Sequence, residues 1–247
     1  MVTVRATPDF DDVYDDPRSM VTYGVNLTTH HVAWQEDGFG ARMVSDGLIV
    51  GEQLPESAEI GSELWTAHDG GIRIMGRSVN DGSVRWKDPR NLYGLKIETV
   101  GAGLFSADMV QEFKENRDTL DLLDSATVKR PAGMTKDSAD DFTFAGRQCV
   151  YDQRSVVVCG VDGYLAALDA HTHKVLWKLT TDDPSREVPK VTTAWHGAVY
   201  GGVAGHGNVI LDASTGKDRG TYSAGYLTLM NEYGGRDQDL TVYPATG

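Results

Sequence analysis

The chain has 247 residues and a net charge of −13, from 36 acidic and 23 basic residues. This charge repels phosphate backbones and anionic lipid surfaces, so nucleic acid and membrane surfaces are not expected as partners. Its apolar runs fall far below the roughly 20 residues of a membrane-spanning helix, so direct membrane insertion of this segment is excluded as well. The length suits one all-β domain over residues 1–247.

Strand-length runs rich in Val, Ile, Leu and Tyr follow one another along the chain, separated by turn sequences such as NDG, VDG and STG. In chain order the runs are 47–52, 72–79, 103–109, 155–161, 164–170, 198–204, 208–214, 226–232 and 239–245. Almost no segment carries the apolar spacing of a helix for more than two turns; residues 111–123 come nearest, and that segment ends in strand-like alternation. The pattern predicts an all-β fold.

One unit recurs along the chain: a strand, a small polar residue, a tight turn and a second strand. In five copies the polar residue is Asn26, Ser78, Asp124, Asp169 and Asp212, at intervals of 52, 46, 45 and 43 residues. A sixth, shortened copy is TVYPATG at 241–247, and an insertion at 54–71 explains the longer first interval. A period of about 45 residues with four strands per unit is the spacing of propeller blades, which need one another to bury their faces.

The repeat, as in VCGVDGYLAALDAHTHKVLW, resembles the quinoprotein-type (PQQ-like) β-propeller repeat. The resemblance rests on a structural tryptophan, a turn glycine and an aspartate before the turn, which are Trp34, Trp86 and Trp177, Gly82 and Gly216, and Asp169 and Asp212. It implies a β-propeller of four-stranded antiparallel blades. Six blades are predicted, with repeats ending near 35, 87, 131, 179, 222 and 247; a larger or incomplete ring is the alternative.

Some repeats depart from this pattern. The third lacks both the turn glycine and the tryptophan, the fifth has Gly220 in place of the tryptophan, and the sixth stops at Gly247. In such propellers an N-terminal strand often completes the last blade. Residues 2–7 are therefore expected to pair with the strand at 239–245 and close the ring.

The recurring residues have physical reasons of their own. The turn needs one residue near φ > 0, which glycine adopts freely and histidine adopts more readily than β-branched residues. His30 and His173 fall on that position, so His30, His31, His171 and His173 are interpreted as turn residues rather than metal ligands. The aspartate accepts backbone N–H bonds within the turn, and the tryptophan packs between blades while its N–H finds an acceptor.

The two cysteines, Cys149 and Cys159, lie in the run CVYDQRSVVVC. If this run is a hairpin with its connection at 153–155, residues whose numbers sum to 308 face each other, and the two cysteines satisfy that condition. They are then placed to form a disulfide, which implies an oxidising compartment. The alternative is a pair of free, partly buried thiols.

Other candidate sites are weaker. The acidic run PDFDDVYDDP at 8–17 offers oxygen donors for calcium but lacks EF-hand spacing, so it is interpreted as a solvated segment. The glycines at 201–208 and the Gly-Lys pair at 214–218 are interpreted as hairpin turns, because strands rather than helices follow them. No catalytic constellation, cofactor-binding residue or metal ligand is predicted.

The leading hypothesis is a non-catalytic binding or scaffold propeller, the extracytoplasmic sensor or interaction domain of a bacterial cell-envelope protein. Its ligand would be a protein, a peptide or an envelope component at the channel mouth or at the rim loops 54–71, 130–141 and 180–190. One alternative is a relative or fragment of a PQQ-dependent dehydrogenase. Another is a cytoplasmic scaffold, because the first residues lack a secretory signal and leave open whether a targeting segment precedes them.

Overall fold

The computed structural model describes residues 2–6, 21–55, 71–90, 92, 94–110, 118–131, 133–134, 148–183, 186–223 and 225–244. The chain divides into two compact units, each described by itself. The N-terminal unit is Met1–Thr99 with Gly103–Arg130, and the C-terminal unit is Val100–Ala102 with Pro131–Gly247. Within the described residues no helix is long and apolar enough to cross a membrane.

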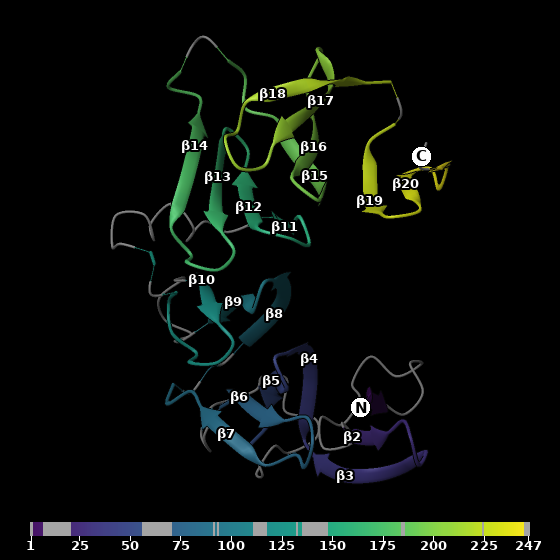
Figure 1. The fold of residues 1–247 in the computed structure, drawn as a ribbon. Coiled ribbons are helices and arrows are strands. Elements are labelled where there is room, and N and C mark those ends of the chain that lie inside the picture. Colours follow the sequence, from purple (N-terminus) through teal and green to yellow (C-terminus); the bar gives the residue numbers. More distant parts are fainter. Residues whose placement is uncertain are drawn as a thin grey trace. The chain divides into compact units, whose positions relative to one another are not determined.

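The described strands up to residue 124 form three antiparallel sheets (Figure 1). The first contains β1 (Val2–Ala6), β2 (Val21–Asn26) and β3 (His31–Asp37). The second contains β4 (Phe39–Ser45), β5 (Leu48–Gln53), β6 (Arg73–Ser78) and β7 (Val84–Lys87). The third contains β8 (Gly94–Gly101), β9 (Leu104–Val110) and β10 (Asp118–Asp124).

The C-terminal unit continues the same pattern with three further sheets. One contains β11 (Gln148–Tyr151), β12 (Val156–Val161), β13 (Tyr164–Asp169) and β14 (Val175–Thr180). The next contains β15 (Lys190–Trp195), β16 (Ala198–Val203), β17 (Gly207–Asp212) and β18 (Asp218–Tyr222). The last contains β19 (Leu227–Asn231), β20 (Gly234–Asp237) and β21 (Val242–Pro244).

In the four-stranded sheets the inner strands are more buried than the fourth strand. Four consecutive residues are buried in the middle of β5 and of β13, so both faces of these strands are covered. The fourth strands β7, β14 and β18 are mostly exposed or half-buried. Strands covered on both faces need an apolar layer on each side, which neighbouring sheets supply in a propeller. This confirms the predicted all-β fold of four-stranded antiparallel blades.

Short turns with left-handed backbone connect the first and second strands of several sheets. Two consecutive residues have positive φ at Asp46–Gly47, at Ala102–Gly103 and at His196–Gly197. This is the geometry of a type I′ hairpin, whose twist matches that of the flanking strands. The turn residues therefore fix which strands pair and where each pair ends.

The expected ring closure was wrong about the first strand. Residues Val2–Ala6 pair with β2, with Val2 opposite Val25 and Ala6 opposite Val21. The first repeat unit, residues 24–34, covers parts of β2 and β3, and β1 is the third strand of that sheet. β1 therefore belongs to the first sheet, and the expected pairing of residues 2–7 with the strand at 239–245 is not the pairing that the structure gives to β1. The blade number and the single domain over 1–247 stay predictions.

Candidate functional site

Tryptophans join neighbouring sheets inside each unit. The indole N–H donates to a backbone carbonyl of the next sheet, always at the residue directly after the small polar position of the repeat. The pairs are Trp34 with Val79 at 2.9 Å, Trp86 with Ser125 at 2.9 Å, and Trp177 with Ala213 at 2.7 Å. Each junction therefore combines a large, partly buried ring with a satisfied N–H.

The turn residue of the next sheet packs against the same tryptophan. A Cβ atom at Gly216 (φ 68°) would lie 2.7 Å from the ring of Trp177, and one at Gly82 (φ 70°) would lie 2.8 Å from Trp34. Glycine is thus required twice, by the backbone conformation and by the ring. In the third sheet Val128 takes this position with φ 53°, and Val128 and Trp86 both pack against the same buried apolar cluster.

The aspartates before the turns act on the turn backbone. Asp169 Oδ1 accepts the N–H groups of His171 at 3.1 Å and of Thr172 at 2.7 Å, together with the Thr172 hydroxyl at 2.8 Å. The hydrogen bonds from Thr172 lower the pKa of Asp169, and the hydroxyl of Ser214 in the same way lowers the pKa of Asp212. Both carboxylates have structural roles in their turns.

Of the four histidines interpreted as turn residues, His30, His171 and His173 lie in turns, whereas His31 is the first residue of β3 and pairs with Asn26. His30 has φ 58° and donates its N–H to the Asn26 carbonyl at 2.7 Å, and His173 has φ 57° and donates to the Asp169 carbonyl at 2.8 Å. Among the described residues no group of three or more His, Cys, Asp and Glu side chains is placed to hold a metal ion. The acidic run 8–17 lies outside the described residues.

The glycine-rich segments considered as phosphate sites are also turns. Residues 201–208 run from β16 through a turn into β17, and residues 214–218 form the turn from β17 into β18. In both places a strand follows, and a helix N-terminus of the kind that binds phosphate is not formed there.

The two cysteines form a disulfide. Cys149 on β11 lies opposite Cys159 on β12, their Cα atoms are 4.1 Å apart and their sulfurs are bonded. Cys159 is 1% exposed, and Cys149 is partly buried. The bridge therefore joins the first two strands of the β11–β14 sheet from within the fold.

A buried carboxylate that the sequence did not point out joins this sheet to the next one. Asp152 is fully buried, and its Oδ1 accepts the N–H groups of Arg154 at 3.0 Å, Ser155 at 2.7 Å and Val156 at 2.8 Å. Its Oδ2 accepts the N–H of Gly197 at 3.0 Å, in the turn between β15 and β16. Hydrogen bonds to a charged group contribute about 1.5–3 kcal/mol each, so Asp152 holds the two turns firmly together.

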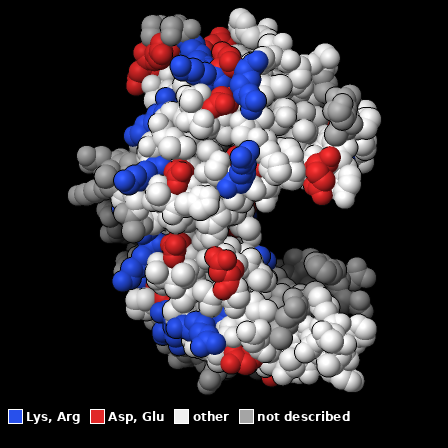
Figure 2. Space-filling view, in the orientation of Figure 1, with Lys and Arg blue, Asp and Glu red and all other residues white. Residues whose placement is uncertain are grey.

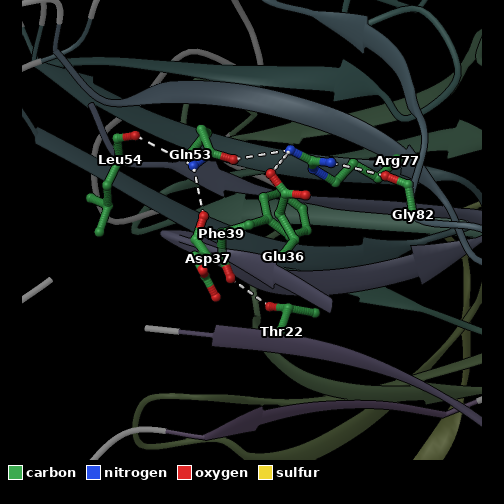
Figure 3. A network of polar contacts seen from close by, with 8 residues as sticks. All are labelled: Thr22, Glu36, Asp37, Phe39, Gln53, Leu54, Arg77 and Gly82. Atoms are coloured by element: carbon green, nitrogen blue, oxygen red, sulfur yellow. Dashed lines mark hydrogen bonds and ion pairs between the residues drawn. The ribbon is translucent and has the colours of Figure 1, made fainter. Parts of the chain in front are cut away.

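A buried arginine has the corresponding role in the N-terminal unit (Figure 3). The guanidinium of Arg77 on β6 donates to the Gly82 carbonyl at 2.9 Å, to Glu36 at 2.5 Å and to Gln53 at 3.2 Å, and it lies 5.1 Å from the centre of the Phe39 ring. Arg77 is 6% exposed. Nothing in the repeat pattern indicated this ion pair, because Glu36 and Arg77 are brought together only when the first two sheets pack.

The three rim loops proposed for binding differ in how much the structure describes. Residues 56–70 of the first loop lie outside the described residues, as do 132 and 135–141 of the second. The third, 180–190, is described except for 184–185. This loop connects β14 to β15 and forms one wall of a cleft, here named the C-terminal cleft.

The C-terminal cleft encloses about 320 Å³ and is lined by Arg186, Glu187, Pro189, Val203, His206, Val209 and Asp218. Arg186 crosses it: one guanidinium nitrogen donates to the Gly216 carbonyl at 2.8 Å, and another pairs with the Asp218 carboxylate. His206 Nε2 lies 3.5 Å from the Glu187 carboxylate. The loop is thereby tied to the β17–β18 turn, and the cleft presents charges of both signs beside apolar Val203 and Val209.

The chain is similar to several solved structures, but with low sequence identity and low TM-scores. No protein-family model matches the chain, and no curated protein matches it. BamB from Moraxella catarrhalis is 14% identical with a TM-score of 0.31, over 98% of this chain and 97% of that one. A europium-containing methanol dehydrogenase is 13% identical with a TM-score of 0.44, over 98% of this chain and 52% of that one. The Dos1 propeller is 12% identical with a TM-score of 0.41, over 90% of this chain and 58% of that one. TM-scores below 0.5 say nothing about the function of this chain.

Proposed function

We propose that this chain is a non-catalytic binding propeller that takes a protein or peptide ligand at the C-terminal cleft and works outside the cytoplasm. The observation that carries the proposal is the cleft itself. A rim loop that the repeat pattern left free for function, 180–190, forms a wall of a concave site of about 320 Å³. Ligand sites are concave and are often built from loops held on a rigid scaffold.

The residues that line this cleft are better suited to binding a peptide than to catalysing a reaction. Val203 and Val209 offer apolar contact, while Glu187 and His206 offer an acceptor and a donor at the rim. The guanidinium of Arg186 is already bound to the Gly216 carbonyl and the Asp218 carboxylate on the opposite wall, so its role is to hold the two walls together. A surface of mixed charge around apolar contacts is typical of recognition sites whose polar groups set the orientation of a ligand.

The proposed location rests on the disulfide. Bonds between cysteines persist in secreted and periplasmic proteins and are rare in the cytosol, where thiol-reducing systems act on them. The Cys149–Cys159 bridge spans two adjacent strands whose register places the cysteines opposite each other. An oxidising compartment is where this bridge would form and persist.

Site-specific photocrosslinking tests the binding site. A benzoylphenylalanine placed at His206, at the rim of the cleft, should crosslink one defined protein or peptide in the native host. The matched control is the same group at Lys174, an exposed residue of the β13–β14 turn outside the cleft. The proposal fails if both positions give the same products, or if Glu187→Lys leaves the His206 product unchanged.

A separate experiment tests the location. Protein from its native host is alkylated without reduction and analysed by mass spectrometry. We expect Cys149 and Cys159 to be unmodified until a reductant is added. Two alkylated thiols in the native material would contradict the extracytoplasmic part of the proposal and favour a cytoplasmic scaffold.

A further inference from the structure

A second cleft lies in the N-terminal unit, at a place that the proposed function does not involve. It encloses about 370 Å³ and is lined by Asp88, Pro89, Arg90, Leu123, Val128, Lys129 and Arg130. One wall is the connection that leaves β7, and the other is the turn and chain that follow β10. We name it the N-terminal cleft.

The charge of this cleft is opposite to that of the whole chain. Among its described lining residues the one acidic group is Asp88, which is 2% exposed and is held by Arg90, whose Nε lies 3.0 Å and whose Nη2 lies 2.6 Å from the carboxylate oxygens. The other wall contributes the exposed residues Lys129 and Arg130. Arg90 is thus paired within its own wall, and Lys129 and Arg130 give the other wall a basic rim in a chain whose net charge is −13.

The basic character extends beyond the lining residues. Arg85 and Lys87 on β7 are exposed in the same unit. Figure 2 shows Lys and Arg side chains over β7 and beside β10, with Asp and Glu side chains among them. A local positive field of this kind attracts anionic ligands and raises their local concentration near the cleft.

The floor of the cleft is apolar. Leu123 is 3% exposed, Val128 is half-buried against the apolar cluster that contains Leu123, and Pro89 adds a rigid apolar edge. An apolar floor with a basic rim suits a ligand that carries an apolar group between negative charges. Such a combination is the common form of small ligand sites, where apolar contact supplies affinity and a few polar groups set orientation.

The walls are fixed by backbone hydrogen bonds. Asp88 donates its N–H to the Ile74 carbonyl at 2.9 Å, which ties the first wall to β6. In the second wall, Val128 donates to the Asp124 carbonyl at 2.9 Å and Asp124 donates to the Lys129 carbonyl at 2.9 Å. The basic side chains therefore project from a closed turn and from a residue anchored to a sheet, so the site is organised before a ligand binds.

We propose that the N-terminal cleft binds an acidic peptide segment in which an apolar side chain is flanked by carboxylates. The apolar side chain contacts Leu123 and Val128, and the carboxylates meet the exposed rim that contains Lys129 and Arg130. A long polyanion such as duplex DNA or an anionic bilayer would also cover the surrounding surface of a strongly acidic chain, where repulsion opposes it. A short peptide keeps its charges within the basic rim.

Fluorescence anisotropy with a labelled hexapeptide, acetyl-DDLFDD-amide, tests the proposal on the full chain. We expect saturable binding, and we expect Lys129→Glu to weaken it by roughly tenfold, because the substitution replaces an attraction by a repulsion at the rim. The matched control is the double variant Arg85→Glu with Lys87→Glu, which changes more charge in the same unit without touching the lining. It should weaken binding by less than about threefold, through the long-range field alone.

Two further peptides separate the contributions. The neutral peptide acetyl-NNLFNN-amide should bind far more weakly if the carboxylates meet the basic rim. The peptide acetyl-DDGGDD-amide should lose affinity if the apolar floor takes part. Equal binding of all three peptides, or a Lys129→Glu variant with unchanged affinity and an unchanged unfolding midpoint, would overturn the proposal.

Two controls separate a specific cleft from a destabilised fold and from a nonspecific basic surface. If Lys129→Glu lowers the unfolding midpoint, the conservative variant Lys129→Gln replaces it, with a smaller expected loss of roughly threefold. Competition arms with a DNA duplex and with phosphatidylglycerol vesicles identify a nonspecific basic surface: displacement of the hexapeptide at equal charge concentration would contradict the proposal. The crosslinking test at His206 concerns the other unit, so either proposal can fail alone.

Discussion

The two clefts have one kind of wall in common and differ in where one arginine points. Each lies between the connection that leaves a fourth strand and the sheet that follows it. In the N-terminal cleft Arg90 turns back to Asp88 within its own connection. In the C-terminal cleft Arg186 crosses to the Gly216 carbonyl and to Asp218 on the opposite wall.

This difference shows how one scaffold gives two kinds of site. The pairing inside one wall masks an acidic group and leaves the cleft open and basic. The pairing across the cleft ties both walls together and balances their charges. The backbone repeat fixes where a cleft forms, and single side chains decide what it binds, which is why a fold of this class does not specify its ligand.

The largest expected effect tests whether the tryptophan junctions of the two units are equivalent. Trp177→Ala and Trp86→Ala should each lower the free energy of unfolding by about 3–5 kcal/mol, because each removes a large ring that packs between sheets and leaves a cavity. Urea denaturation followed by circular dichroism measures this. Leu176→Ala, on the same strand but 41% exposed, is the control and should stay within about 0.5 kcal/mol of the original protein. A loss below about 1 kcal/mol for either tryptophan would show that its junction does not support the fold.

The next effect compares the two arginines directly. Arg90→Ala should cost about 3 kcal/mol, because it leaves the buried Asp88 carboxylate without its guanidinium partner. Arg186→Ala should cost at most about 1 kcal/mol, because its partner Asp218 is 63% exposed and is hydrated when the pair is broken. If both variants lose the same free energy of unfolding in urea denaturation, the Arg90–Asp88 pair and the Arg186–Asp218 pair do not differ as described. Hydrogen exchange at residues 214–218 should rise only in Arg186→Ala.

A third test uses the residue that faces each tryptophan from the turn. Gly216→Ala should cost about 2 kcal/mol, because alanine is strained at φ 68° and its Cβ meets the Trp177 ring at 2.7 Å. Val128→Gly should change the free energy of unfolding by less than about 1 kcal/mol, because lost packing is offset by relief of a β-branched residue at φ 53°. Thermal unfolding of the two variants measures both. A larger loss in Val128→Gly would show that its side chain, rather than the turn backbone, holds that junction.

Local patterns in the sequence were sufficient for the blade repeat and for its turns. A polar residue, a positive-φ position and a tryptophan recur at fixed spacing because each interacts within a few residues or with the adjacent sheet. The left-handed backbone at His173, for example, follows from its alignment with turn glycines. The pairing of Cys149 with Cys159 depends only on hairpin register, which is also local.

Interactions between distant segments were not predictable in the same way. The Arg77–Glu36 pair, the Arg186–Asp218 pair and the pairing of β1 with β2 depend on which surfaces meet after packing. One missed signal was nevertheless present in the sequence. Two positions before the polar residue, repeats with a tryptophan have a small residue, at Gly24, Gly76 and Ala167, and repeats without one have Leu122 and Ile210. In register, Gly24, Gly76 and Ala167 lie opposite the tryptophans, so the small residue makes room for the ring.

The smallest expected effect is the acid response of the turns. The Ser83 hydroxyl lowers the pKa of Asp81 to about 2 in the N-terminal unit, and the Ser214 hydroxyl lowers the pKa of Asp212 in the C-terminal unit. A carboxylate whose pKa is lower in the folded state stabilises the fold above its unfolded pKa of about 4, and this stabilisation is lost as the pH falls through the folded value.

The variants Asp81→Asn and Asp212→Asn remove this titration, one in each unit. Asn26 already occupies the position of the first repeat that corresponds to Asp212, and it accepts the Thr28 N–H at 2.9 Å, so an amide fits the turn at Asp212. Each variant should therefore be slightly less stable than the original protein at pH 7, and the difference should disappear as the pH falls from about 4 toward 2. Because both groups face solvent, screening keeps the difference small. Unfolding midpoints measured across this range check the sign, and a difference that grows toward low pH would mean that the folded state does not favour the charged carboxylates.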